Sequence, residues 1–179
     1  MNISTIWIFD LPLLLSLLGA TISASTDVKW GKIKNYVTIP LILFGWGWAF
    51  INGAMVGIQN IGMSIFVGVL LSMAGKVGEG DLKLAVGIAS CLKLFLSIYF
   101  VAFLFLTLFL SALWIRLKIY GFKLKPAFSA IRTEAILEMG GIRDANTMIH
   151  GDEVRHIGGP VILLALVLTL IYAKMGGLI

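Results

Sequence analysis

The residues with the clearest chemical potential are two acids at the ends of hydrophobic segments. Residues 78–81 read Gly-Glu-Gly-Asp, and the apolar stretch 82–91, interrupted only by Lys83, follows at once. An ionised acid costs about 2.5–3.5 kcal/mol at the centre of a membrane helix, so acids at bilayer depth are rare and usually functional. A second acid, Asp27, ends the first hydrophobic segment. Because two hydrophobic segments separate Asp27 from Asp81, we expect both carboxylates on the same side of a membrane.

Two neighbouring carboxylates can perform the chemistry of an aspartic protease. Held close together they do not both ionise easily, so they share one proton. The ionised acid takes a proton from a water that attacks the scissile carbonyl, and the neutral acid donates a hydrogen bond to the developing oxyanion. Each acid also has a simpler interpretation. Asp81 could be the N-cap of the helix that follows, and Asp27 could be an interfacial residue beside Lys29, Lys32 and Lys34.

The other ionisable residues do not predict a second site. Asp10 lies about 25 Å from Asp27 along a helix, too far to join the pair. His150 and His156 share one loop, and we do not expect them to bind a metal. A single cysteine, Cys91, excludes a disulfide within the chain and a cysteine-based zinc site. We therefore expect no metal and no cofactor. The remaining acids fall in predicted loops and need no function: Glu79, Glu134, Glu138, Asp144, Asp152 and Glu153.

The composition is that of a polytopic membrane protein. The 179 residues are 59% hydrophobic and 13% charged, with a mean hydropathy of +1.01. Their apolar runs are continuous rather than alternating, which favours an all-α bundle over a β-barrel. The net charge of +5 does not indicate nucleic-acid binding, because basic residues retained on the cytoplasmic side explain it. The first segment lacks the basic start of a secretory signal, which indicates a retained helix.

Six hydrophobic segments are predicted to form helices. A spanning helix needs about 20 mostly apolar residues, and five segments approach this length: 6–25, 36–52, 58–74, 94–117 and 157–173. The stretch 81–91 reaches only about 16 Å, so we expect a short fourth helix inside the bundle. Gly78 and Gly80 permit unusual backbone torsions before it. This predicts a mobile element with little buried length, which keeps the two aspartates apart until a substrate binds.

The basic residues predict the topology. With six crossings and the N-terminus outside, only Lys93 and Lys174 fall on the outer side, which agrees with the positive-inside rule. Both termini are then on the outer side of the cytoplasmic membrane, and Asp27 and Asp81 face the cytoplasm. The basic residues on the cytoplasmic side are Lys29, Lys32, Lys34, Lys76, Lys83, Arg116, Lys118, Lys123, Lys125, Arg132, Arg143 and Arg155.

The segment 118–156 is the one long polar stretch and is predicted to be cytoplasmic. Pro126 could open a short helix that runs to Met139. Phe128, Ile131 and Ala135 would share one face of this helix, which could lie on the membrane surface. A flexible loop explains the sequence equally well.

The motifs resemble those of a known family. Residues 78–84, Gly-Glu-Gly-Asp-Leu-Lys-Leu, are similar to the GxGDxKL motif of the prepilin peptidases, which are GxGD membrane aspartic proteases. Asp27 followed by residues 33–35, Ile-Lys-Asn, resembles the first aspartate of the family with its Ile-Pro-Asn. The late segment 158–160, Gly-Gly-Pro, is similar to the late Gly-Pro of the family.

The resemblance implies an activity and a substrate. It implies that Asp27 and Asp81 are the catalytic pair and that Gly78, Gly80 and Lys83 position the motif or the substrate. It also implies cleavage of a short basic leader, just after a glycine, from type IV prepilin-like or preflagellin-like precursors. The expected partners are therefore a substrate with a hydrophobic N-terminal helix and the lipid bilayer, with no nucleic acid.

Two features depart from the pattern of the family. Lys34 stands where the family usually has proline, which could change the turn before the second helix. Long members carry an N-terminal cytoplasmic domain with two cysteine pairs, linked to methylation of the new N-terminus, whereas this chain has one cysteine. We expect a single membrane-embedded peptidase domain over residues 1–179, without a methyltransferase or zinc domain, as in the short peptidase-only members.

Two other functions use the same residues differently. A small proton- or cation-coupled transporter could use the acids as ligands. Such transporters usually hold their acids near the midplane and contain internal repeats, and neither feature is visible here. A purely structural membrane subunit would leave the glycine-rich acid motif unexplained. An aspartic peptidase is therefore the favoured interpretation.

Overall fold

The computed structural model describes residues 3–73, 78–120, 122, 124, 129, 133 and 158–176. The helix expected from Pro126 to Met139 lies almost entirely outside these residues, and so do His150 and His156. The hydrophobic segments and both candidate acids lie within them.

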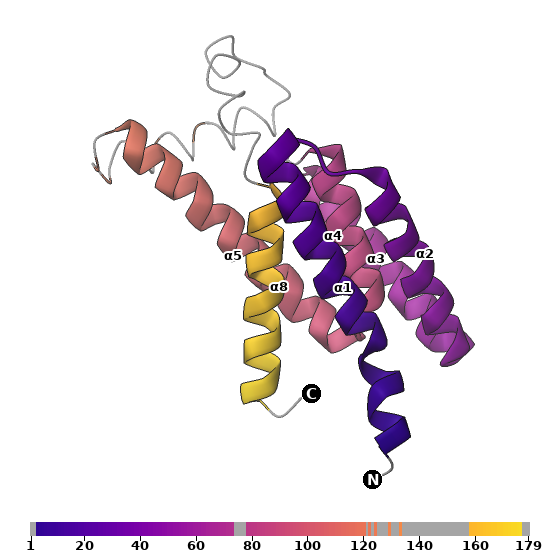
Figure 1. The fold of residues 1–179 in the computed structure, drawn as a ribbon. Coiled ribbons are helices and arrows are strands. Elements are labelled where there is room, and N and C mark those ends of the chain that lie inside the picture. The colour runs from indigo at the N-terminus through magenta and orange to yellow at the C-terminus, as the bar shows by residue number, and fades with distance from the viewer. Residues whose placement is uncertain are drawn as a thin grey trace.

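All six hydrophobic segments form helices, which confirms the predicted all-helical membrane bundle (Figure 1). Four of the helices are long and apolar enough to cross a membrane, namely α1, α3, α5 and α8. The other two are shorter, with 17 residues in α2 and 13 in α4. The helices are α1 (Ile3–Trp30), α2 (Asn35–Ile51), α3 (Ala54–Met73), α4 (Glu79–Cys91), α5 (Leu94–Ile119) and α8 (Gly158–Met175).

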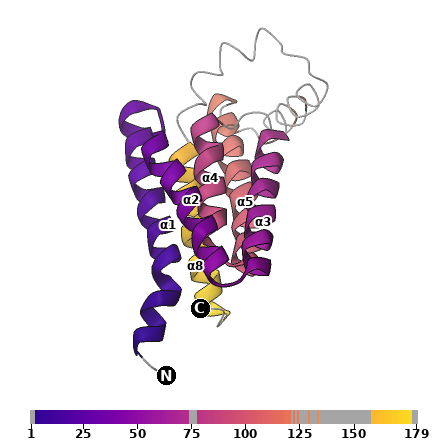
Figure 2. The same cartoon turned by 90° about the vertical axis from the view of Figure 1, so that its right-hand side faces the viewer.

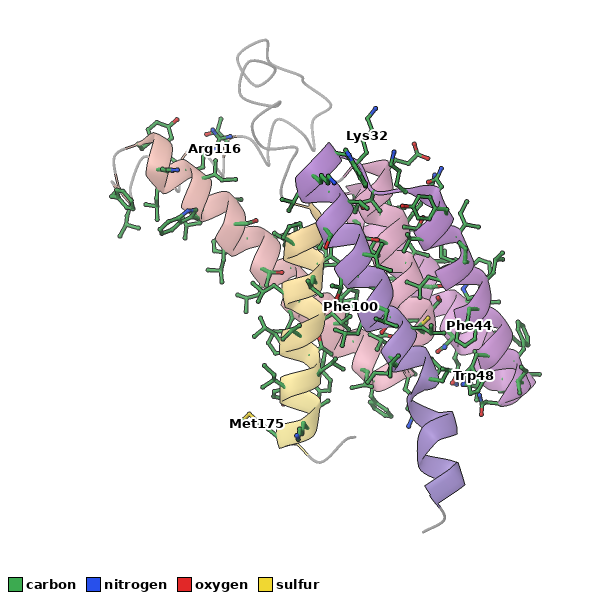
Figure 3. All side chains as sticks on the ribbon, viewed as in Figure 1. Lys32, Phe44, Trp48, Phe100, Arg116 and Met175 are labelled. Atoms are coloured by element: carbon green, nitrogen blue, oxygen red, sulfur yellow. The ribbon has the colours of Figure 1, made fainter. Side chains whose placement is uncertain are left out.

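The helices run in alternating directions, and α5 is inclined to the others (Figure 1). The start of α1 and the end of α8 lie at the same end of the bundle (Figure 1). Figure 3 shows Lys32, after α1, and Arg116, near the end of α5, at the opposite end from Met175. This placement of the helix ends is the one that six membrane crossings require. The number of crossings and the orientation in the membrane stay predictions.

Helix α1 continues beyond its predicted end. It ends at Trp30 rather than at residue 25, because Gly31 adopts a left-handed conformation with φ of 62°. The N–H of Gly31 donates to the carbonyl oxygen of Asp27 at 2.7 Å, which closes the last turn of the helix. Asp27 therefore lies on a helix and not in the loop that follows.

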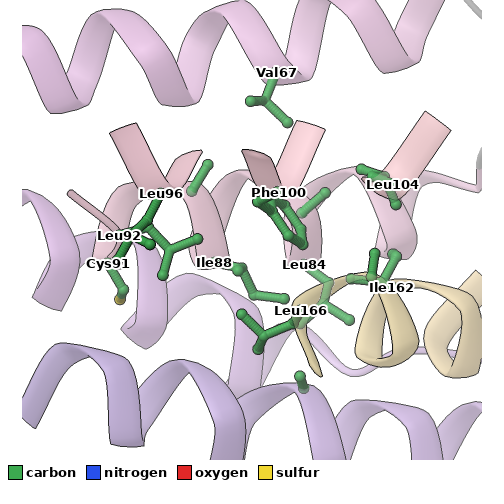
Figure 4. Packing of buried hydrophobic residues seen from close by; sticks show 14 of the residues in the cluster. Val67, Leu84, Ile88, Cys91, Leu92, Leu96, Phe100, Leu104, Ile162 and Leu166 are labelled. Atoms are coloured by element: carbon green, nitrogen blue, oxygen red, sulfur yellow. The ribbon is translucent and has the colours of Figure 1, made fainter. Parts of the chain in front are cut away.

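Helix α4 is the centre of the bundle. It packs against α2, α3, α1 and α8 (Figure 2). Its buried residues include almost the whole segment from Leu84 to Cys91. Figure 4 shows Leu84 and Ile88 of α4 among Phe100 of α5 and Leu166 of α8. The premise that this helix has little buried length was wrong, because its neighbours enclose it on several sides.

Close contacts at small residues fix α2 and α4 in a parallel arrangement. Near the start of both helices, a Cβ atom added at Gly80 would lie 3.0 Å from the Cβ of Ile33. Near their ends, a Cβ atom at Gly45 would lie 2.6 Å from the carbonyl carbon of Ser90. The two segments approach this closely because glycine has no side chain at either contact. The packing holds the first turn of α4 beside the first turn of α2.

Candidate active site

Asp27 is a buried acid in the last turn of α1. Its side chain is enclosed, with the residue only 4% exposed. Its Oδ2 accepts a hydrogen bond from the backbone N–H of Gly159 at 2.9 Å. Gly159 lies in the first turn of α8, where backbone N–H groups have no partner inside the helix. The burial does not fit the simpler interpretation of Asp27 as an exposed interfacial residue.

Asp81 lies in the first turn of α4. The helix begins at Glu79, and Gly78 is its N-cap, so the interpretation of Asp81 as the N-cap residue was wrong. Asp81 instead lies three residues after the N-cap, the position of the acid in a capping box, and its carboxylate lies beside Gly78. Its Oδ1 is buried and makes no hydrogen bond to any residue that the structure describes.

The two acids meet at the first two residues of α8. A Cβ atom added at Gly158 would overlap the carboxylate of Asp81. A Cβ atom added at Gly159 would lie 3.2 Å from Oδ2 of Asp27. The two carboxylates also interact electrostatically. The structure therefore brings together the pair of acids that the sequence singled out, at the junction of α1, α4 and α8.

Gly78 and Gly80 contribute space rather than unusual torsions. Gly78 has a φ of −61°, and Gly80 is part of the helix. A Cβ atom added at Gly78 would lie 3.1 Å from Oδ2 of Asp81, and one at Gly80 would lie 3.3 Å from the carbonyl oxygen of Ile33. Both glycines let other groups come close to the first turn of α4. The torsional freedom expected from the sequence is not used in this structure.

Lys83 joins the start of α4 to the start of α2. Its Nζ forms an ion pair with Glu79, one turn earlier in α4. The same Nζ lies 3.4 Å from Oδ1 of Asn35, the first residue of α2. The contacts place Lys83 beside the helix that carries Asp81, while a role in holding a substrate stays a prediction.

Lys34, where the family usually has proline, lies in the turn before α2. Lys34 is the N-cap of α2, with an extended backbone at φ of −88° and ψ of 132°. This φ is somewhat more negative than the range of about −65 ± 15° to which proline is restricted. The ammonium group of Lys34 lies 5.8 Å from the ring centroid of Trp30, and that of Lys29 lies 5.1 Å from it. Lys34 thus contributes an extended backbone before α2 and a contact with Trp30.

Sequence reasoning missed the contacts of Gly158 and Gly159 with the acids. The hydrogen bond from Gly159 to Asp27 joins residues separated by 132 positions, so no local spacing reveals it. The signal available in the sequence was the Gly-Gly-Pro segment at 158–160, which was noted only as a motif. Pro160 is compatible with the first turn of α8, since N–H groups there have no intrahelical acceptor.

The comparison with protein families identifies the family of this chain. The type IV leader peptidase family matches residues 13–116, that is 104 of the 179 residues. The matched range contains both Asp27 and Asp81 and ends before Gly158. Comparisons with curated proteins and with solved structures found no significant match. Since the family covers more than half of the chain and the helical membrane bundle agrees with it, the chain belongs to the type IV leader peptidase family.

Proposed function

We propose that this protein is an aspartic endopeptidase that removes the leader from type IV prepilin-like or preflagellin-like precursors, with Asp27 and Asp81 as its two catalytic acids. The observation that carries the proposal is the convergence of two acids, from the end of α1 and the start of α4, on the Gly158-Gly159 backbone. Acids within membrane-spanning segments are rare and usually functional, and α1 is long and apolar enough to span a membrane.

The hydrogen bonds restrict where the shared proton can lie. A backbone N–H only donates, so Oδ2 of Asp27 must act as an acceptor toward Gly159. Oδ1 of Asp81 has no hydrogen-bond partner among the described residues. The proton is therefore shared between Oδ1 of Asp27 and the carboxylate of Asp81, with a bound water beside them.

The reaction uses both acids in turn. The ionised acid removes a proton from the water, whose oxygen attacks the scissile carbonyl. The neutral acid donates a hydrogen bond to the oxyanion of the tetrahedral intermediate. Breaking the C–N bond then requires a proton for the leaving amine, which comes from the acid that took the proton from water. The pair returns to its starting state with one proton.

The position of the acids suits a substrate with one apolar helix. Asp27 is in the last turn of α1 and Asp81 in the first turn of α4, so both lie at one end of the bundle. The basic residues Lys29, Lys32 and Lys34 follow Asp27 at this end, which favours the cytoplasmic face. A leader in the cytoplasm joined to a helix in the bilayer would bring its junction to this depth.

Co-expression with candidate precursors tests this function. The protein should convert a prepilin-like precursor into a shorter product, and N-terminal sequencing of the product should place the cut just after a glycine. A precursor with that glycine replaced by a bulky residue provides the control and should stay uncut. Intact precursors throughout, together with proton flux in vesicles that contain the protein, would instead favour the transporter.

A further inference from the structure

We propose that Gly158 and Gly159 are positioning residues of the active site, which set the placement of Asp81 and Asp27 relative to each other. This inference rests on the proposed peptidase function and adds a third helix, α8, to the two that carry the acids. The evidence is the set of contacts that each glycine makes with one of the carboxylates.

Gly158 provides the surface against which Asp81 lies. A Cβ atom at residue 158 would overlap the Cγ, Oδ1 and Oδ2 atoms of Asp81. Any other side chain would force the carboxylate to move. The helix that carries Asp81 cannot easily shift to compensate, because Leu84, Ala85 and Ile88 are completely buried. A change at residue 158 should therefore be transmitted to the carboxylate itself.

Gly159 holds Asp27 in two ways. Its N–H donates to Oδ2 at 2.9 Å, which fixes the orientation of the carboxylate. A Cβ atom at residue 159 would lie 3.0 Å from the Cα of Ala24 and 3.1 Å from the Cβ of Asp27. Since Ala24 would meet it with backbone rather than a flexible side chain, the start of α8 would have to move away from α1. Alanine at this position should lengthen the hydrogen bond to Asp27.

Gly158 and Gly159 are adjacent in the chain, so a displacement of one also moves the other. The positions of Asp81 and Asp27 therefore depend on each other. Consecutive Cα atoms are 3.8 Å apart, so the first turn of α8 acts as a short, rigid spacer between the carboxylates. Misplacement of a reacting group by about 1 Å can lower the rate by about 100-fold. The structure therefore assigns to α8 a role in the chemical step and not only in the packing of the bundle.

Alanine substitutions test this role, with kcat and KM measured separately on a precursor that the wild-type protein cleaves. Gly158→Ala should lower kcat by about 100-fold with KM unchanged, because substrate contacts remain while the acids are displaced. Gly159→Ala should lower kcat less, since its contacts are tight rather than overlapping. Gly47→Ala and Gly62→Ala are matched controls, because a Cβ atom there has no neighbour within 4 Å.

Gly45→Ala separates positioning from simple packing damage. A Cβ atom at Gly45 would overlap Ser90, at the end of α4 far from Asp81. This variant should unfold at a lower temperature in detergent, and its kcat per folded molecule should fall much less than that of Gly158→Ala. Equal kcat losses for Gly45→Ala and Gly158→Ala, or a wild-type kcat for Gly158→Ala, would overturn the inference. If Gly158→Ala does not fold, the kcat of Gly159→Ala provides the test, and a wild-type kcat for that variant would reject the inference. A wild-type protein that cleaves no precursor counts against the proposed function instead.

Discussion

The two acids are chemically unequal although they belong to one site. Asp27 is nearly enclosed and has one oxygen fixed by the N–H of Gly159. Asp81 is partly exposed and keeps Oδ1 without a hydrogen bond among the described residues. A buried polar atom without a partner is uncommon in folded proteins and often marks a functional position. The unpartnered oxygen of Asp81 is therefore the atom that we expect to share the proton of the pair.

Lengthening the fixed acid should impair catalysis even though the charge is kept. Asp27→Glu extends the side chain by one methylene, and the carboxylate then no longer meets Gly159 at the distance seen here. A displacement of about 1 Å predicts a fall in kcat of about 100-fold. The matched control is Glu79→Asp, which shortens an exposed acid of the same motif and should keep near-normal turnover. Comparable turnover of Asp27→Glu and the wild type would show that the position of Asp27 is not critical.

The pair of acids was predictable from the sequence, whereas their surroundings were not. Asp27 and Asp81 stand out because each interrupts an apolar context. The carboxylate contacts at Gly158 and Gly159 depend on how α8 docks between α1 and α4, and this docking leaves no local trace in the sequence. The same limitation explains why Gly78 and Gly80 were interpreted through torsions when they serve close packing.

At the scale of the elements, α4 ends inside the bundle, where its last carbonyl groups need hydrogen-bond donors from other helices. The last carbonyl groups of any helix have no intrahelical donor. In α4 the carbonyl of Ser90 accepts from Nδ2 of buried Asn60 at 3.0 Å, and that of Ala89 accepts from Oγ of Ser97 at 3.1 Å. Side chains from α3 and α5 thus satisfy the end of the helix that carries Asp81, which keeps it in place.

Removing the amide of Asn60 should destabilise the protein. Asn60→Ala leaves the carbonyl of Ser90 without its donor, and an unsatisfied buried group costs about 1–3 kcal/mol. Thermal unfolding in detergent should show a clear decrease in midpoint. Asn52→Ala is the matched control, because Asn52 donates to the carbonyl of Trp48 at an exposed position. Equal shifts for the two variants would contradict the role assigned to Asn60.

The lengths of the hydrophobic segments predicted the helices well, but they did not predict which helices pack against one another. The segment expected at 94–117 is α5, Leu94–Ile119, and that expected at 157–173 is α8, Gly158–Met175. By contrast, the end of α1 depended on Gly31 and was placed too early. The mobility expected for α4 assumed little buried length, yet uniformly apolar segments do not reveal which residues face lipid and which face other helices.

At the scale of the whole molecule, one end of the bundle carries the markers of the cytoplasmic interface. Trp30 lies there with the ammonium groups of Lys29 and Lys34 near its ring. Tryptophan and lysine are typical of membrane–water interfaces, and lysine favours the cytoplasmic side. Lys32 and Arg116 lie at this end, and Met175 lies at the other (Figure 3). The active site and the basic residues are therefore expected on one side of the membrane.

Labelling of single cysteines in intact cells tests this orientation. A membrane-impermeant thiol reagent added outside should label Met175→Cys and should label Lys32→Cys only after the cells are permeabilised. The native Cys91 is buried, so the unsubstituted protein is the background control. Labelling of Lys32→Cys in intact cells would invert the orientation or change the number of crossings.

The most direct test of the central claim is cleavage by the purified protein with each acid replaced by its amide. Asp27→Asn and Asp81→Asn keep nearly the same shape but cannot exchange the proton that an aspartic pair shares. Both variants should fold as the wild type does, bind a prepilin-like precursor and release no product. Near-normal turnover by either folded variant would show that Asp27 and Asp81 are not the catalytic pair.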